Sequence, residues 1–205
     1  MAHNKPEWGV RRLRRTDLPI DTAEMARYLI GKTLVHDLAA GRVSGRIVET
    51  EAYVVGDAAG HAFRGLTRRN RSLFLDRGRA YVHFAYGMHM MLNVSSEIRG
   101  VGAGVLLRAL EPLDGISFME RRRHHASLLD LARGPGRLAQ AMGISLRCDG
   151  LDLCAPGPLW LGASTRPAGE IGSSVRIGVS REARRLLRFY DRNNPYVSGP
   201  RSLSA

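Results

Sequence analysis

The sequence predicts a single α+β domain with a curved, mainly antiparallel β-sheet that is flanked by short helices. Most of the predicted strands are joined by short connections, which link antiparallel strands because parallel strands need a long crossover. The chain has 205 residues, enough for one domain with a buried core. Neither a repeat nor a shift in composition marks an internal boundary. We expect residues 1–17 to form a mobile basic arm and residues 18–205 to form the domain.

The first predicted elements are a helix and a β-hairpin. Residues 21–24 (Asp-Thr-Ala-Glu) form a capping-box pattern that opens a short helix, and Gly31 ends it. Strand patterns follow over 33–37 and 42–55, with Gly41 between them. The glycine and the strand patterns on either side of it predict a hairpin.

The rest of the chain combines a long loop with further strands and two helices. Residues 56–78 are rich in Gly, Arg and Asn and have weak periodicity, so we expect a functional loop there. The remaining predicted elements are strands over 79–85, 90–95, 101–109, 174–179 and 186–190, and helices over 114–131 and 134–143.

The charge of the chain indicates a polyanionic partner. Lys and Arg number 31 against 19 Asp and Glu, which gives a formal net charge of +12. Most of the positive charge is arginine, whose planar guanidinium matches the geometry of phosphate. The alternative is a solvated basic surface that serves solubility, since net charge alone does not specify a partner. Nucleic acid is the leading prediction.

Neither a membrane nor a metal is an expected partner. No apolar run approaches the ~18 residues of a membrane span, and the N-terminus lacks the apolar stretch of a secretory signal. The two cysteines, Cys148 and Cys154, are too few for a disulfide framework and form no CxxC zinc pattern. We expect a cytoplasmic, nucleoid-associated protein without a metal or a cofactor.

Two carboxylates stand close together in the strand pattern over residues 45–53. Side chains alternate along a strand, so Glu49, Glu51 and Tyr53 are predicted to share one face. Hydrolases of sugars that use two carboxylates hold them ~5 to 9 Å apart. The spacing of roughly 7 Å along a strand is compatible with that chemistry.

Seven motifs between residues 22 and 198 follow one another in the order in which they occur in one known family. They are GRIVETEAY at 45–53, His61, TRRNR at 67–71, YVHFAYGMHMMLNVSS at 81–96, GVLLRALEP at 104–112, GPGRLAQAMGI at 134–144 and LRFYDRNNPYVS at 187–198. With these motifs the chain resembles the alkyladenine (3-methyladenine) DNA glycosylase family. The resemblance implies an enzyme that extrudes a damaged purine from duplex DNA and hydrolyses its N-glycosidic bond.

The resemblance assigns the catalytic roles to Glu51 and Arg108. Glycosidic cleavage passes through an oxocarbenium-like state, which needs a carboxylate to deprotonate water and to stabilise the positive charge. Glu51 matches the general base of the family, and Glu49 is then expected to be structural and paired to an arginine. Arg108 matches an arginine that orients the carboxylate. Because it lies in an apolar strand it must be paired, either with Glu49 or Glu51 or with a phosphate.

Four residues match the family's base pocket. Tyr53 would stack on the extruded base, and His61 would hold it by stacking and through a backbone N–H. Asn93 matches an asparagine that excludes the 2-amino group of guanine. His83 departs from the pattern, because the family commonly carries tyrosine there. Imidazole titrates near neutral pH, so we hypothesise that a protonated His83 weakens the preference for cationic bases at low pH.

The same resemblance places residues that contact the duplex around the extruded base. Tyr86 matches a side chain that fills the gap left by the nucleotide, with Met88 beside it. The expected contacts to the DNA backbone come from arginines in the TRRNR and GPGR motifs, namely Arg68, Arg69, Arg71 and Arg137.

A monofunctional enzyme acting as a monomer on damaged duplex DNA is the expected function. A strand-nicking lyase uses an amine nucleophile, and the only lysines, Lys5 and Lys32, stand outside the motifs. Two alternatives stay open: a protein that binds lesions or nucleic acid without catalysis, and a hydrolase of another N-glycoside.

Overall fold

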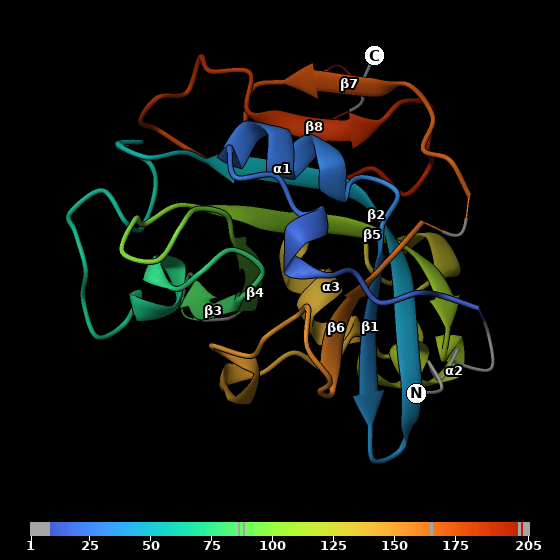
Figure 1. The fold of residues 1–205 in the computed structure, drawn as a ribbon. Helices are drawn as coiled ribbons and strands as arrows, with labels where there is room; N and C mark the ends of the chain where they lie inside the picture. Colours follow the sequence, from blue (N-terminus) through green and yellow to red (C-terminus); the bar gives the residue numbers. More distant parts are fainter. Residues whose placement is uncertain (1–8, 86, 88, 165, 201, 203–205) are drawn as a thin grey trace.

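A curled antiparallel β-sheet with short helices packed on it forms the fold of this protein (Figure 1). The structure, a computed structural model, describes residues 9–85, 87, 89–164, 166–200 and 202. Within them the strands are β1 (Thr33–Leu38), β2 (Gly41–Tyr53), β3 (Ala80–Ala85), β4 (His89–Ser95), β5 (Gly104–Asp114), β6 (Leu159–Gly162), β7 (Ile171–Ser174) and β8 (Arg188–Asp191). The helices there are α1 (Thr22–Leu29), α2 (Ile116–Arg122) and α3 (Pro135–Ala141). The predicted fold class, a single α+β domain with a mainly antiparallel sheet, is confirmed.

The long strand β2 organises the sheet. The strand order is β3-β4-β5-β2-β1-β6, and β8 pairs with both β2 and β7. β1 pairs with the first half of β2, and β8 continues along the same side opposite Glu49, Thr50 and Glu51. The register of β2 against β5 shifts on both sides of Glu49. Such irregularities bend a strand and increase its twist, so the sheet curls at the place where the two carboxylates lie.

Helix α1 packs on β2 and lies beside β8 (Figure 1). The Asp21 side chain accepts a hydrogen bond from the Glu24 backbone N–H at 2.8 Å, which confirms the predicted start of the helix. The buried side chains of α1 include Met25 and Leu29. Thr50 Oγ1 of β2 donates to the Ala26 carbonyl at 2.9 Å. The helix thereby fixes the stretch of β2 that carries the candidate catalytic residues.

The segment preceding α1 differs from the expected free arm. Val10 and Leu13 are buried, and the Leu13 N–H donates to the Leu161 carbonyl of β6 at 2.9 Å. The Arg12 guanidinium lies 4.5 Å from the centre of the Trp160 ring. Residues 9–17 therefore pack on the domain because they bury apolar side chains there. Residues 1–8 lie outside the described residues.

The hairpins have the structure predicted from the sequence, whereas β5 and the region after it differ from the prediction. The β1–β2 and β3–β4 hairpins and the helix α3 are confirmed. The helix predicted over 114–131 is present but shorter: α2 begins at Ile116 and ends at Arg122, and His124 and His125 adopt left-handed backbone angles that stop it. β5 continues past the expected end at Ala109 and through Pro112, because the proline lies at a register shift opposite Gly45, where a strand tolerates it.

Two strands of the C-terminal third differ from the prediction. The predicted strand over 174–179 is wrong, because β7 ends at Ser174 and residues 175–180 leave the sheet to run past the end of β2. The short strand β6 was not predicted. Within the described residues, no helix is long and apolar enough to cross a membrane.

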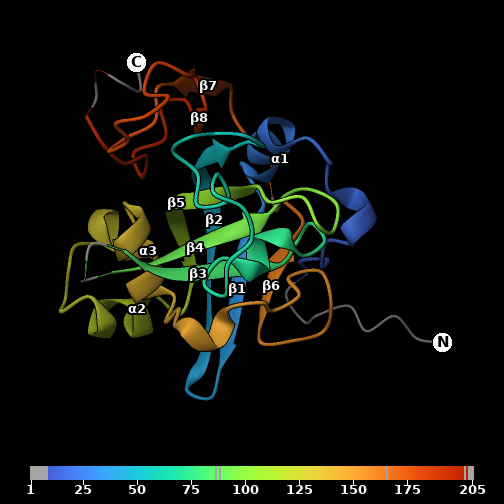
Figure 2. The ribbon, with the colours of Figure 1, turned by 90° about the vertical axis from the view of Figure 1, so that its left-hand side faces the viewer.

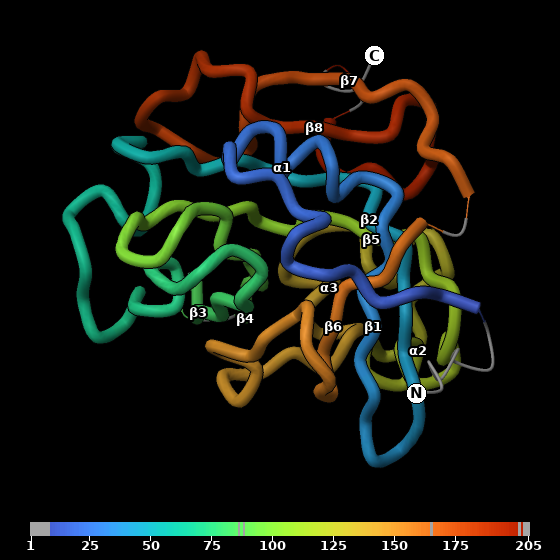
Figure 3. The backbone as a smooth tube through the Cα atoms, viewed as in Figure 1, coloured from blue at the N-terminus to red at the C-terminus, as the bar shows by residue number. Residues whose placement is uncertain are grey.

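A long loop joins β2 to β3 and can be followed as the tube between them in Figure 3. The buried side chain of Asn70 holds it together. Asn70 Nδ2 donates to the carbonyls of His61 (2.8 Å) and Gly65 (2.9 Å), and Oδ1 accepts from the Thr67 N–H at 2.6 Å. Asn70 was not a predicted site residue. Its hydrogen bonds fix the backbone at His61, a predicted pocket residue.

Candidate active site

A cavity of about 820 Å³ opens where β2, β3, β4 and β5 meet the long loop and the segment after β7. Its walls include six residues predicted from the sequence: Glu51, Tyr53, His61, His83, Asn93 and Arg108. Figure 2 shows the loop between β2 and β3 lying on the same side of the molecule as the β3–β4 hairpin. The volume lies within the range typical of ligand pockets. Residues spread over half the chain thus form one site.

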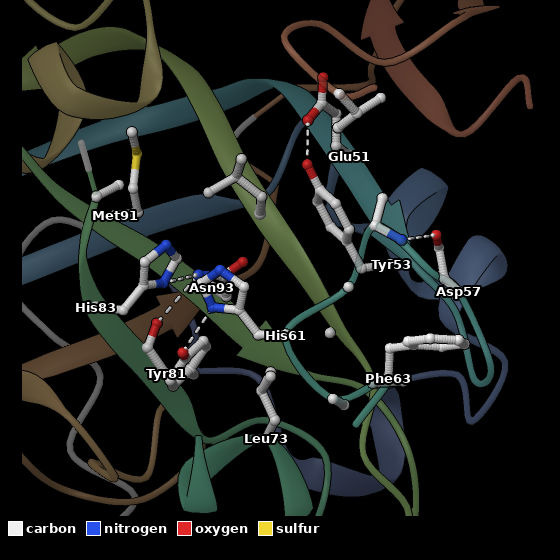
Figure 4. A pocket seen from close by; sticks show the side chains of 18 of the residues that line it. Glu51, Tyr53, Asp57, His61, Phe63, Leu73, Tyr81, His83, Met91 and Asn93 are labelled. Atoms are coloured by element: carbon white, nitrogen blue, oxygen red, sulfur yellow. Dashed lines mark hydrogen bonds between the residues drawn. The ribbon is translucent and has the colours of Figure 1, made fainter. Parts of the chain in front are cut away.

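Glu51 is fully buried and held by two hydrogen bonds and an ion pair. Its Oε1 accepts a hydrogen bond from the Ile177 backbone N–H at 2.7 Å and pairs with Arg108 Nη1 at 3.1 Å. Its Oε2 accepts from the Tyr53 hydroxyl at 3.0 Å (Figure 4). Burial, followed by the charge of Glu51, raises the pKa of Tyr53, so this hydroxyl stays a donor. A carboxylate has about four acceptor sites, so two hydrogen bonds and one ion-pair contact leave one site for a water or a substrate atom.

Glu49 is also fully buried but takes no part in lining the cavity. Its Oε1 accepts from Arg108 Nε at 2.8 Å and Arg188 Nε at 2.7 Å, and its Oε2 accepts from the Ser198 N–H at 2.7 Å. Glu49 is paired to arginine, as predicted. Since protein donors surround both oxygens, the geometry does not support a second catalytic carboxylate.

Arg108 joins the two carboxylates. The sequence left open whether Arg108 pairs with Glu49 or with Glu51, and the structure shows both pairs. Burial by itself lowers the pKa of Arg108, but the charges of Glu51 and Glu49 outweigh it and raise the pKa. Arg108 is therefore a permanent cation that fixes the orientation of Glu51.

Aromatic rings form the wall opposite Glu51 (Figure 4). The centres of the His61 and His83 rings lie 4.3 Å apart, and His83 stacks on Tyr81 at 5.1 Å. His61 Nδ1 and the Tyr81 hydroxyl share a hydrogen bond of 2.8 Å. Tyr81 was not predicted as a site residue. Its spacing of two from His83 on β3, which puts both side chains on one face, was a signal that could have found it.

The environment of His83 fixes its protonation state. Asn93 Nδ2 donates to the Tyr81 carbonyl at 3.3 Å and contacts His83 Nδ1 at 3.4 Å. An amide NH₂ only donates, so His83 Nδ1 accepts and the ring proton lies on Nε2. Burial, followed by the charge of His61, lowers the pKa of His83 to about 4. A pKa near 4 argues against the hypothesis that His83 becomes charged near neutral pH.

We expect the ratio of excision rates for 7-methylguanine and hypoxanthine to be no more pH-dependent in the wild type than in His83→Tyr between pH 6 and 8. A histidine whose pKa lies near 4 is neutral throughout this range, so no charge is gained that could repel a cationic base. Single-turnover assays on duplexes that carry one lesion measure the ratio. A fall of the wild-type ratio towards pH 6 that is absent from His83→Tyr would contradict this expectation.

Protonation of His83 has a second consequence, for stability. Because the folded pKa lies below the ordinary value of 6.5, the unfolded chain binds the proton more tightly. The contribution of the neutral ring is complete above about pH 6.5 and is lost as the pH falls towards about 4.

Exposed arginines surround the cavity. Arg68, Arg69 and Arg71 line a second hollow of about 870 Å³, which shares His61, Tyr81 and His83 with the first. Arg64 and Arg181 line both hollows and were not predicted as site residues. The predicted contact Arg137 lies on α3, where it pairs with Asp130 at 2.8 Å. Tyr86 and Met88 lie outside the described residues.

The fold and the site together define a class of protein. A buried carboxylate with one free acceptor site faces a cavity walled by aromatic rings, and exposed arginines stand around it. This arrangement suits an enzyme that hydrolyses a planar base from a nucleic acid.

Comparison with known proteins gives the family. The pattern of the family described as methylpurine-DNA glycosylase (MPG) matches residues 16–195. A protein of Mesorhizobium japonicum is 67% identical over 92% of this chain and 91% of its own length. One from Paraburkholderia phytofirmans is 54% identical over 93% and 90%. Both are named as candidate 3-methyladenine DNA glycosylases. The chain belongs to the methylpurine-DNA glycosylase family, as its motifs predicted.

Proposed function

We propose that this DNA glycosylase flips alkylated or deaminated purines out of duplex DNA and hydrolyses their N-glycosidic bond with a water that Glu51 activates. Its family and the names of its relatives support the coarser statement, a 3-methyladenine DNA glycosylase of base excision repair. The observation that carries the proposal is the free acceptor site of the buried Glu51 carboxylate at the cavity wall.

The proposed chemistry follows from the contacts of Glu51. As the bond between C1′ and the base breaks, positive charge develops on the sugar, and a carboxylate stabilises it. Glu51 accepts a proton from the water while the water oxygen bonds to C1′. Arg108 and the Ile177 N–H hold Oε1 in place. The products are a free base and an abasic site.

The cavity walls would recognise the base. Tyr53 and the rings of His61 and His83 would stack on it, and stacking contributes roughly 1 to 3 kcal/mol per base. Asn93 would crowd the 2-amino group of guanine. For Tyr86 and Met88, the proposal of a wedge in the duplex rests on the family motif alone.

Arginines would hold the DNA backbone on the outside of the cavity. Exposed guanidinium groups next to the cavity support this role for Arg68, Arg69 and Arg71, and Arg137 would join them from α3. Because phosphate contacts release counterions, affinity for the duplex should fall as salt rises. We propose a monomer that acts at the nucleoid, where its substrate lies.

We propose a monofunctional reaction, which needs no amine nucleophile. Among the residues that the structure describes, no lysine lines the cavity. Lys32 donates to Ser164 Oγ at 3.2 Å and lies 4.3 Å from the centre of the Tyr28 ring. We therefore expect cleavage that leaves the abasic strand intact.

Duplex oligonucleotides with one defined lesion test the function. Hypoxanthine, 1,N6-ethenoadenine and 7-methylguanine are each placed in one duplex, and the free base is measured by chromatography. We expect base release, with strand breaks only after alkali. Binding without release from any lesion would support a non-catalytic lesion binder. If the enzyme released the base from free nucleosides and added duplex DNA did not inhibit that reaction, a hydrolase of another N-glycoside would be supported.

A further inference from the structure

Two consecutive residues after β7 hold three consecutive residues of β2. The Ile177 N–H donates to Glu51 Oε1 at 2.7 Å. Arg176 Nη1 donates to the Ala52 carbonyl at 3.0 Å, and the Arg176 guanidinium carbon lies 4.7 Å from the centre of the Tyr53 ring. The end of β2, where the base would bind and react, is thus clamped from one side by residues 176 and 177.

The burial of the charged Arg176 side chain costs free energy. Its side chain and that of Asp57 are both completely buried, and the two form an ion pair in which Arg176 Nη1 and Nη2 both bind the carboxylate. Arg176 Nε has no hydrogen-bond partner among the described residues. Taking two charges out of water cancels much of their attraction, so a buried pair is weak evidence for a role in stability. A role in the site is the better explanation.

The Tyr53 ring separates Arg176 from the cavity. Tyr53, Asp57 and Ile177 line the cavity, and Arg176 does not. Figure 4 shows the Tyr53 hydroxyl pointing to Glu51, with Asp57 beside Tyr53. A guanidinium over an aromatic face attracts the ring, so Arg176 holds the Tyr53 ring from behind. The position of that ring also sets the hydrogen bond of its hydroxyl to Glu51.

We infer that Arg176 is a positioning residue for base excision, which holds the Tyr53 ring against the extruded base and its hydroxyl on Glu51, with Asp57 as its counterion. This inference deepens the function proposed above and rests on it. Arg176 acts without touching the substrate. Its removal should slow excision once the lesion is bound, while affinity for undamaged duplex stays unchanged.

The test uses variants that avoid a lone buried charge. The double change Asp57→Asn with Arg176→Met removes both charges together, which proteins tolerate better than the loss of one partner. We expect its single-turnover excision rate at saturating enzyme to fall roughly 10- to 100-fold, as for a misplaced catalytic contact. Asp191→Asn with Arg46→Met is the matched control: this pair is also buried, and Arg46 contacts Asp191 and Pro167 away from the cavity.

The same double change in a Tyr53→Ala background separates positioning from general damage. If Arg176 acts through the Tyr53 ring, the further loss there should be less than about threefold, because coupled residues are not additive. A full additional loss, or a double variant as fast as the wild type, would overturn the inference while the proposed function stands. A wild-type chain that excises no lesion would overturn both.

Discussion

Replacing Glu51 by Gln is expected to slow base excision severely and to leave lesion binding intact. A positioned general base contributes typically 10² to 10⁴ in rate, so a loss of roughly that size follows. The amide oxygen can accept from the Ile177 N–H and Arg108 as Oε1 does, and the NH₂ group can donate to the Tyr53 oxygen. The fold and the cavity should therefore persist. Single-turnover release of hypoxanthine and binding to the same duplex measure the two effects.

Glu111→Gln serves as the control for this variant. Glu111 lies on β5 and pairs with the exposed Arg166 at 2.6 Å, away from the cavity. Its loss should leave the excision rate unchanged. If Glu51→Gln retained a rate within a few-fold of the wild type, Glu51 would not be the general base, and the proposed mechanism would have to be abandoned.

Replacing Glu49 by Ala is expected to destabilise the protein severely. The change leaves Arg108 and Arg188 buried without the carboxylate that both contact at 2.7–2.8 Å. Breaking a buried pair by removing one partner costs about 3–5 kcal/mol. At about 2–4 °C per kcal/mol for a chain of this size, Tm should fall by roughly 10 °C or more. Thermal unfolding followed by calorimetry measures the change.

Asp130→Asn is the corresponding change in an ion pair on the surface and serves as the comparison for Glu49→Ala. It breaks the ion pair with Arg137, in which both side chains are nearly half exposed. Exposed pairs contribute about 0–1 kcal/mol, so the change in Tm should stay within a few degrees. Equal shifts for Glu49→Ala and Asp130→Asn would show that the buried network does not hold the domain together.

Local patterns predicted the parts of the fold that depend on neighbours in the sequence. The capping residues before α1 and the glycine at the start of β2 act within a few residues, so the sequence showed both elements. The motifs identified six residues that line one cavity in the structure: Glu51, Tyr53, His61, His83, Asn93 and Arg108. Their proposed roles await the experiments above.

Contacts between distant segments account for what the sequence did not show. β6 has four residues and pairs with β1, which lies more than a hundred positions earlier. The segment after β7 resembles a strand in composition, yet the burial of Arg176 against Asp57 takes it out of the sheet. The lowered pKa of His83 likewise depends on its burial and on the charge of His61, which lies in another segment. No local pattern encodes such pairings.

The place of β8 beside β2 has a consequence for the order in which the enzyme becomes active during synthesis. Arg188 and Ser198 complete the hydrogen bonds of Glu49, and Ile177 completes those of Glu51. All three lie later in the sequence than the six predicted residues that line the cavity. Until they arrive, Glu49 and Glu51 each lack part of their hydrogen bonds and share the cation Arg108. We therefore expect a nascent chain to gain full activity only after the segment through Ser198 has docked along β2.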